Sequence, residues 1–177
     1  ASLFTAGTTV LEYFATNVEL ATLVYWKFGD VGGATWETNG FLWATALAVT
    51  VYFLWKAWDY NVLAAGDDTA RSLGVNVSRT RLLGTVVASL ATAITVSLFG
   101  IIGFVGLVVP HIVRRVIGGD EQFLLPASCV CGGLLLLSAD TLARTVISPL
   151  VLPVGVLTSF VGAPLFVYLI LRGRAYW

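Results

Sequence analysis

Charged, metal-binding and redox-active side chains are scarce in this 177-residue sequence. Charged residues make up 11% of it, the formal net charge is zero, and it contains two cysteines and one histidine. A zero net charge gives no reason to expect a nucleic acid as a partner. Cys129 and Cys131 would diverge by about 200° on a helix, so they can neither form a disulfide nor share a metal ion. His111 has no second ligand near it in the sequence, and we therefore predict no metal site and no cofactor.

Sequence motifs of catalysis are also lacking. The sequence contains no GxSxG, HExxH, phosphate-binding P-loop or paired-carboxylate pattern. We therefore predict that this chain has no catalytic residues and is not an enzyme on its own.

Apolar residues, in contrast, dominate the sequence. They make up 58% of it, and the mean hydropathy of +0.89 is typical of a polytopic membrane protein. A hydrocarbon core about 30 Å thick needs about 20 mainly apolar helical residues to cross it. The segments that fit, wholly or in part, are Ser2–Phe14, Phe41–Trp55, Leu82–Phe99, Ile101–Ile117, Leu124–Val146 and Val154–Leu171.

The predicted fold is therefore an all-α, polytopic membrane helix bundle. It has about six transmembrane helices, together with short interfacial and cytoplasmic helices, in one domain that covers residues 1–177. The lipid bilayer is its expected surrounding. Because the sequence begins inside an apolar helical pattern without a methionine or a helix cap, we expect it to be part of a longer protein.

The basic residues are distributed unevenly between the two sets of span ends. One set carries Lys56, Arg71, Arg79, Arg81, Arg114, Arg115, Arg172 and Arg174, and the other carries only Lys27 and Arg144. The positive-inside rule makes the first set cytoplasmic, which predicts a multi-pass protein of the cytoplasmic membrane.

A hydrophilic segment at residues 60–81 separates two of the predicted spans. Asp67 is a good N-cap for a short helix near residues 69–73, and Gly74 can end that helix in a left-handed turn. Ser78 can then cap the next helix. A folded segment at the cytoplasmic face indicates a docking surface for another protein, and a solvated loop with incidental caps is the alternative.

Two segments at the outer face have irregular composition. Residues 17–39 predict an interfacial half-helix followed by a glycine-rich loop, and Pro149, Pro153 and Gly155 precede the last span in a similar arrangement. Either both are walls of a solute vestibule, or both are plain outer loops.

Four segments in order carry a family resemblance. They are NVLAAGDDTARSLGVNVSRTR, GFVGLVVPHIVRR, LLPASCVCGGLLLLSADTLAR and LPVGVLTSFVGAPLFVYLILRGR. Together they resemble the C-terminal half of permease subunits of the iron-chelate, haem and vitamin B12 ABC importers of prokaryotes. The resemblance implies a ten-span subunit that pairs with a second permease copy, binds cytoplasmic ATP-binding subunits and receives cargo from an extracytoplasmic substrate-binding protein.

The resemblance also implies roles for individual residues. Those that match the cytoplasmic coupling helices, which sit in a cleft of the ATPase, are Gly66, Asp67, Ala70, Arg71, Leu73 and Gly74. Arg144 matches an arginine that faces acidic residues of the binding protein, although a pair with Asp140 on the same helix is the alternative. The expected pathway lining comprises Thr5, Thr8, Thr9, Thr92, Thr95 and Ser97.

The function that this resemblance implies is ATP-driven import of a ferric siderophore, haem or cobalamin by alternating access. An ion-coupled secondary carrier is the main alternative, but it needs carboxylates inside the membrane, and these are scarce here. A non-catalytic membrane subunit of another kind is the second alternative.

Overall fold

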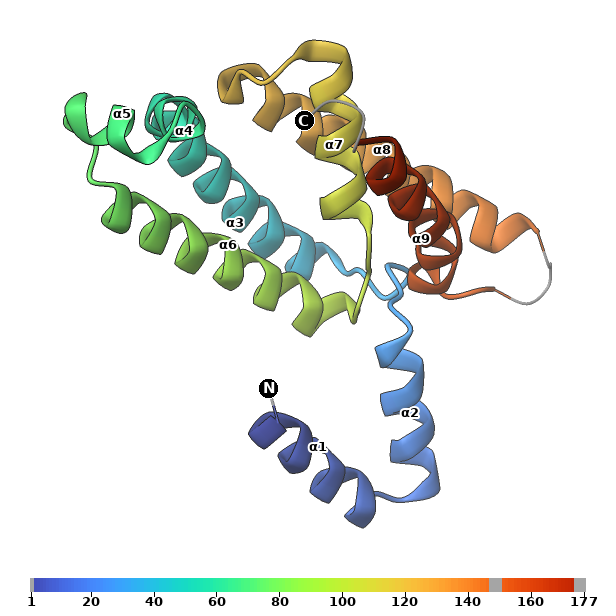
Figure 1. The fold of residues 1–177 in the computed structure, drawn as a ribbon. Coiled ribbons are helices and arrows are strands. Elements are labelled where there is room, and N and C mark those ends of the chain that lie inside the picture. Colours follow the sequence, from blue (N-terminus) through green and yellow to red (C-terminus); the bar gives the residue numbers. More distant parts are fainter. Residues whose placement is uncertain (1, 147–150, 174–177) are drawn as a thin grey trace.

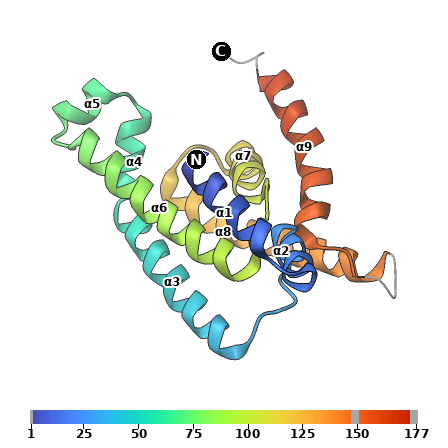
Figure 2. The same ribbon diagram turned by 90° about the horizontal axis from the view of Figure 1, so that it is seen from below.

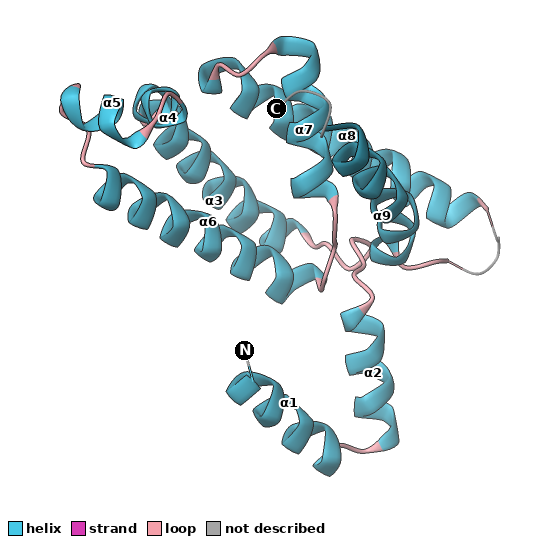
Figure 3. Cartoon of the chain, viewed as in Figure 1, coloured by secondary structure: helices cyan, strands magenta, loops and turns pink. Residues whose placement is uncertain are grey.

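The computed structural model describes residues 2–146 and 151–173, and all regular structure within them is α-helical (Figures 1 and 3). The helices are α1 (Ser2–Phe14), α2 (Asn17–Lys27), α3 (Trp36–Trp55), α4 (Ala57–Ala64), α5 (Asp67–Ser72), α6 (Val77–Phe99), α7 (Val105–Ile117), α8 (Glu121–Thr145) and α9 (Val154–Gly173). The predicted all-α class is confirmed.

The predicted spans differ in how fully they form. By length and composition, α3, α6 and α8 can cross a membrane, and α9 adds a shorter apolar stretch over Val154–Tyr168. Helices α1 and α7 have 13 residues each, which gives about 20 Å of helix against a hydrocarbon core of about 30 Å. The span expected from Ile101 starts later because Gly100 and Phe104 have φ angles of 74° and 66°, which helical backbone does not adopt.

The outer half-helix expected before the first loop is present as α2. Thr16 and Glu19 form a capping box at its start, and the hydrogen bond from the Thr16 backbone N–H lowers the pKa of Glu19. Of the segment expected to form the second half-helix, the described residues 151–153 are non-helical and lead directly into α9. Pro149 lies outside the described residues.

The helices form two packed groups that meet along the bundle. Helices α3 and α6 lie side by side, whereas α7, α8 and α9 pack together around Val109, Val113, Leu124, Ala139, Ala143 and Val154. Helices α1 and α2 extend away from this body (Figure 1), lie in front of it when it is seen from below (Figure 2), and have no buried residues. An ion pair between Lys27 and Glu12 connects them.

The α4–α5 segment and the turn between α7 and α8 lie at the same end of the bundle (Figure 1). The basic residues of these two segments therefore share one end, as the charge distribution predicted. Arg174 lies outside the described residues.

Three chain segments meet at the other end of α6, with their backbones in direct contact. Gly29 follows α2, Gly100 follows α6, and Gly155 lies in the first turn of α9, and we call these residues the glycine junction. The Gly155 N–H donates to the Gly29 carbonyl oxygen at 3.2 Å, and the Asp30 N–H donates to the Phe99 carbonyl oxygen at 2.9 Å. These two backbone hydrogen bonds between segments of the chain thus hold the ends of α2, α6 and α9 together.

Only glycine fits at these positions. A Cβ atom on Gly155 would overlap the carbonyl oxygens of Phe28 and Ile101, and a Cβ atom on Gly100 would overlap the carbonyl oxygen of Trp26. Because these obstacles are backbone atoms, they can give way only if whole segments shift. The contact therefore sets how closely the three helix ends approach.

We predict that Gly155→Ala lowers the thermal unfolding midpoint of the detergent-solubilised permease. Overpacking of this kind costs about 1–3 kcal/mol. The matched control is Gly133→Ala on α8, where an added Cβ meets no atom within 4 Å and helix propensity favours alanine. Equal unfolding midpoints for the two variants would contradict the close backbone contact.

Candidate functional site

The hydrophilic segment is a folded unit between α3 and α6. It consists of α4, α5 and the connections on either side, residues 57–76, and we call it the α4–α5 loop. Gly66, with a φ of 116°, precedes α5, and Gly74, with a φ of 82°, follows it. The left-handed helix stop predicted at Gly74 is therefore present.

Both predicted caps of this loop are wrong. Gly66 occupies the N-cap position of α5, and the Asp67 carboxylate instead forms two hydrogen bonds with the Arg81 guanidinium, at 2.6 and 3.1 Å. A bidentate ion pair with α6 is a stronger partner for this carboxylate than a backbone amide. The cap of α6 is Asn76, whose side-chain oxygen accepts a backbone N–H three residues further on, and not Ser78.

A small apolar core lies between the α4–α5 loop and the first residue of α6. It is formed by Val62, Ala70, Val75 and Val77. Ala70 is completely buried in it. Ala70 therefore shapes the loop from within and is not available to touch another protein.

The remaining expected docking residues lie on the outside of the loop. Arg71 is exposed and pairs only weakly with Asp68, at 4.0 Å. Leu73 is an apolar side chain with 54% of its surface exposed, next to the exposed Gly74. The loop thus presents one apolar and one basic side chain on a folded support.

Tyr60 holds the loop against α6. Its hydroxyl lies where a Cβ atom on Gly84 would be, and it donates to the Thr80 carbonyl oxygen at 3.4 Å. Burial raises the pKa of Tyr60 to about 12. Sequence reasoning missed this contact because it joins residues 20 and more positions apart, and its only signal is a glycine inside a predicted helix.

Arg144 lies at the far end of α8. Its Nε donates to an Asp140 carboxylate oxygen at 2.9 Å, so the alternative pairing within the helix is present. The guanidinium also lies beside Asp30, because a Cβ atom on Gly32 would be 3.2 Å from both side chains. With 48% of its side chain exposed, Arg144 keeps part of its surface for an additional partner.

The residues expected to line a pathway are exposed on α1 and α6. The hydroxyls of Thr8 and Thr9 donate to the Thr5 carbonyl oxygen at 2.8 and 2.9 Å, and those of Thr92 and Thr95 also donate to carbonyls of their own helix. These hydroxyls therefore offer acceptor lone pairs to a solute. Figure 1 shows α1 apart from α6, so the two sets do not form one wall in this chain.

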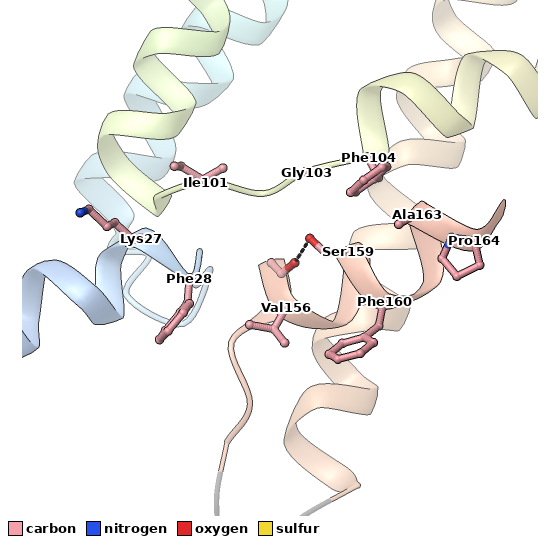
Figure 4. Close-up of a pocket in the computed structure, with 11 residues that line it drawn as sticks. Lys27, Phe28, Ile101, Gly103, Phe104, Val156, Ser159, Phe160, Ala163 and Pro164 are labelled. Atoms are coloured by element: carbon pink, nitrogen blue, oxygen red, sulfur yellow. Dashed lines mark hydrogen bonds between the residues drawn. The ribbon is translucent and has the colours of Figure 1, made fainter. Parts of the chain in front are cut away.

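A cavity of about 690 Å³ lies beside the glycine junction (Figure 4). The end of α2, the non-helical segment 100–104 and α9 surround it, and its lining includes Lys27, Phe28, Ile101, Phe104, Ser159 and Phe160. The Ser159 hydroxyl donates to the Gly155 carbonyl oxygen at 2.7 Å. Sequence reasoning offered the segments around α2 and before α9 as possible vestibule walls, but it missed residues 100–104 because it treated 101–117 as one continuous helix.

An all-helical bundle with membrane-spanning helices and a folded polar loop at one end has the architecture of a transporter's membrane subunit. The sequence pattern of the FecCD transport family matches residues 1–172, and the chain belongs to this family. The resemblance read from the sequence is thereby confirmed.

Three relatives of this chain are named as permeases. The chain is 58% identical to an ABC transporter permease protein of Methanocaldococcus jannaschii, over 97% of this chain and 49% of the relative. It is 41% identical to the hemin transport system permease of Yersinia pestis, over 96% and 51% of the two chains. It is 45% identical to the cobalamin import permease of Halobacterium salinarum, over 88% and 42%.

A solved structure shares the fold. It is an ABC transporter of the metal-chelate type in an inward-facing conformation, with a TM-score of 0.89 and 32% sequence identity. The match covers 97% of this chain and 56% of that one. The chain spans about half the length of the curated relatives that it matches.

We predict that Gly74→Val raises the hydrogen-exchange rate of backbone amides in the α4–α5 loop. A β-branched residue at a φ of 82° is strained by about 1–3 kcal/mol, whereas asparagine tolerates this conformation. Gly74→Asn is therefore the matched control and should exchange at the rate of the unmodified protein. If both variants exchanged equally, the left-handed turn would not be what holds the loop.

Proposed function

We propose that this chain is part of the transmembrane permease subunit of an ATP-driven importer, which moves a metal chelate by alternating access. Its membership of the FecCD transport family and its similarity to hemin and cobalamin permeases support this proposal. The observation that carries it is the folded α4–α5 loop, with its own core, at the end of two membrane-spanning helices.

In this proposal the α4–α5 loop docks into a separate ATP-binding subunit, which hydrolyses the ATP. Leu73 and Arg71 make the contact, since they are the exposed members of the expected set that carry a side chain. Gly66, Asp67, Ala70 and Gly74 give the loop its shape through two backbone positions with positive φ angles, an ion pair and a buried methyl group. A rigid loop transmits a displacement, which a solvated chain would absorb.

The cargo and the other partners follow from the same proposal. The cargo is a ferric siderophore, haem or cobalamin, and acceptor oxygens of Thr8, Thr9, Thr92 and Thr95 contribute to the wall of its path. An extracytoplasmic binding protein delivers the cargo, and a second permease copy completes the path. The complex lies in the cytoplasmic membrane of a prokaryote.

We predict that Leu73→Asp lowers ATP-dependent uptake by the complete transporter in proteoliposomes by about tenfold or more. A carboxylate placed in an apolar groove without a partner costs at least 1.4 kcal/mol, which is about tenfold in an equilibrium constant. Leu73→Met keeps the side chain apolar and should retain uptake. Normal uptake and normal ATPase stimulation in the aspartate variant would remove the loop from the coupling step.

We predict that Arg144→Glu weakens binding of the substrate-binding protein by about two- to fivefold, the range of an exposed ion pair. The loss should be larger at low salt, because ions screen exposed charges over about 8 Å at physiological ionic strength. Arg115→Glu makes the same charge change at the other end of the bundle and is the control. Equal affinities for all three proteins at every salt concentration would leave Arg144 with only its pair to Asp140.

A further inference from the structure

The side chain of Asn61 joins two parts of the molecule that are far apart in the sequence. Its Nδ2 donates to the Asp120 carboxylate at 2.8 Å, and its Oδ1 accepts the backbone N–H of Glu121 at 2.7 Å. Both ends of one amide on α4 are thus bonded to the start of α8. We call these three residues the Asn61 clamp.

The acceptor in this clamp is a charged group. Asp120 is the N-cap of α8 and also accepts the backbone N–H of Gln122 at 3.0 Å. The hydrogen bond from Asn61, followed by that from Gln122, lowers the pKa of Asp120. Hydrogen bonds to an ionised carboxylate are stronger than neutral ones, and a negative charge is favoured at a helix N-terminus.

The clamp continues into α7. The Arg114 guanidinium donates to the Glu121 carboxylate at 2.7 Å, which ties the last turn of α7 to the first turn of α8. A cavity of about 440 Å³ beside the clamp interrupts apolar packing there, with Leu63, Arg114 and Glu121 among its lining. Hydrogen bonds and an ion pair are therefore important contacts between the loop and the α7–α8 turn.

The covalent route between these two parts is long. Helix α6 leads 23 residues away from the α4–α5 loop, about 35 Å, before the chain returns through residues 100–104 and α7. Without the clamp, a displacement of the loop would reach α7 and α8 only through the packing of α3 and α4 on α8 and through the glycine junction at the opposite end. With it, the displacement reaches α7 and α8 directly.

We propose that Asn61 is a positioning residue that makes the α4–α5 loop and the α7–α8 turn move as one body during transport. This inference rests on the proposed function, because it assumes that the loop receives the movement of an ATP-binding subunit. Asn61 itself needs no contact with that subunit or with the cargo.

Spin-label distances in the complete transporter test the common movement directly. Labels are placed at Thr69→Cys on α5 and Val116→Cys on α7, both exposed positions, in a protein whose Cys129 and Cys131 are replaced by serine. The distance between the labels should be the same in the nucleotide-free and ATP-trapped states. In Asn61→Asp, which sets two carboxylates against each other and removes the donor, the distance should differ between the states.

A control and a rescue separate this role from general stability. Gln122→Glu makes the same amide-to-carboxylate change on an exposed side chain in the first turn of α8 and should behave as the unmodified protein. Exchange of the pair, Asn61→Asp with Asp120→Asn, restores one amide and one carboxylate and should recover at least half of the cargo transported per ATP. Asn61→Asp alone should lower that ratio by about fivefold or more.

Two outcomes for Asn61→Asp alone would overturn the inference, and its comparison with Leu73→Asp provides a third. One is a label distance that changes between nucleotide states as much in the unmodified protein as in Asn61→Asp. The other is a loss in Asn61→Asp that matches a fall in its unfolding midpoint and in co-purified ATPase, which would make the clamp a stability element only. If Leu73→Asp uncouples transport and Asn61→Asp does not, the inference fails while the proposed function stands. If Leu73→Asp changes neither uptake nor ATPase stimulation, the proposed function itself fails.

Discussion

Backbone contact at the glycine junction is the constraint on which the arrangement of the helices depends. Three segments meet there without side chains between them, and the hydrogen bonds from Gly155 to Gly29 and from Asp30 to Phe99 satisfy backbone groups that water would otherwise bind. Because the obstacles to a larger residue are carbonyl oxygens, the distance between the ends of α2, α6 and α9 is fixed. The positions of α7 and of the adjoining cavity follow from this distance.

The two ends of the bundle are held by different kinds of interaction. The junction uses backbone contacts, whereas the α4–α5 loop is held by side chains: the bidentate Asp67–Arg81 pair, the packing of Tyr60 over Gly84, and the amide of Asn61. Side-chain bonds at a polar face can break and form again at moderate cost, while backbone overlap cannot be relieved without moving whole helices. In the proposed transport cycle, displacement therefore enters at the end that side chains hold.

Non-helical backbone at residues 100–104 separates α6 from α7 within the apolar part of the sequence. Such backbone is tolerated in membrane proteins only where protein buries it or a watery cavity borders it. The first condition is met at Gly100, which packs against the end of α2, and the segment also lines the cavity of about 690 Å³. Phe104 has a left-handed backbone conformation and packs on Gly162 of α9, so the restart of the helix depends on a neighbouring span.

The sequence by itself determined the all-helical class, the family, the charged end of the bundle, α2 and the left-handed stop at Gly74, and it offered the Asp140–Arg144 pair as an alternative to docking. Hydropathy, charge counts and caps depend on residues a few positions apart, and such local terms can be read without a structure. Only the tertiary structure decided that Asp67 turns to Arg81, that Ala70 is buried, and that Asn61 reaches Asp120. These contacts join residues from 14 to 59 positions apart, or close a core between helices, and they form only once complete helices have packed.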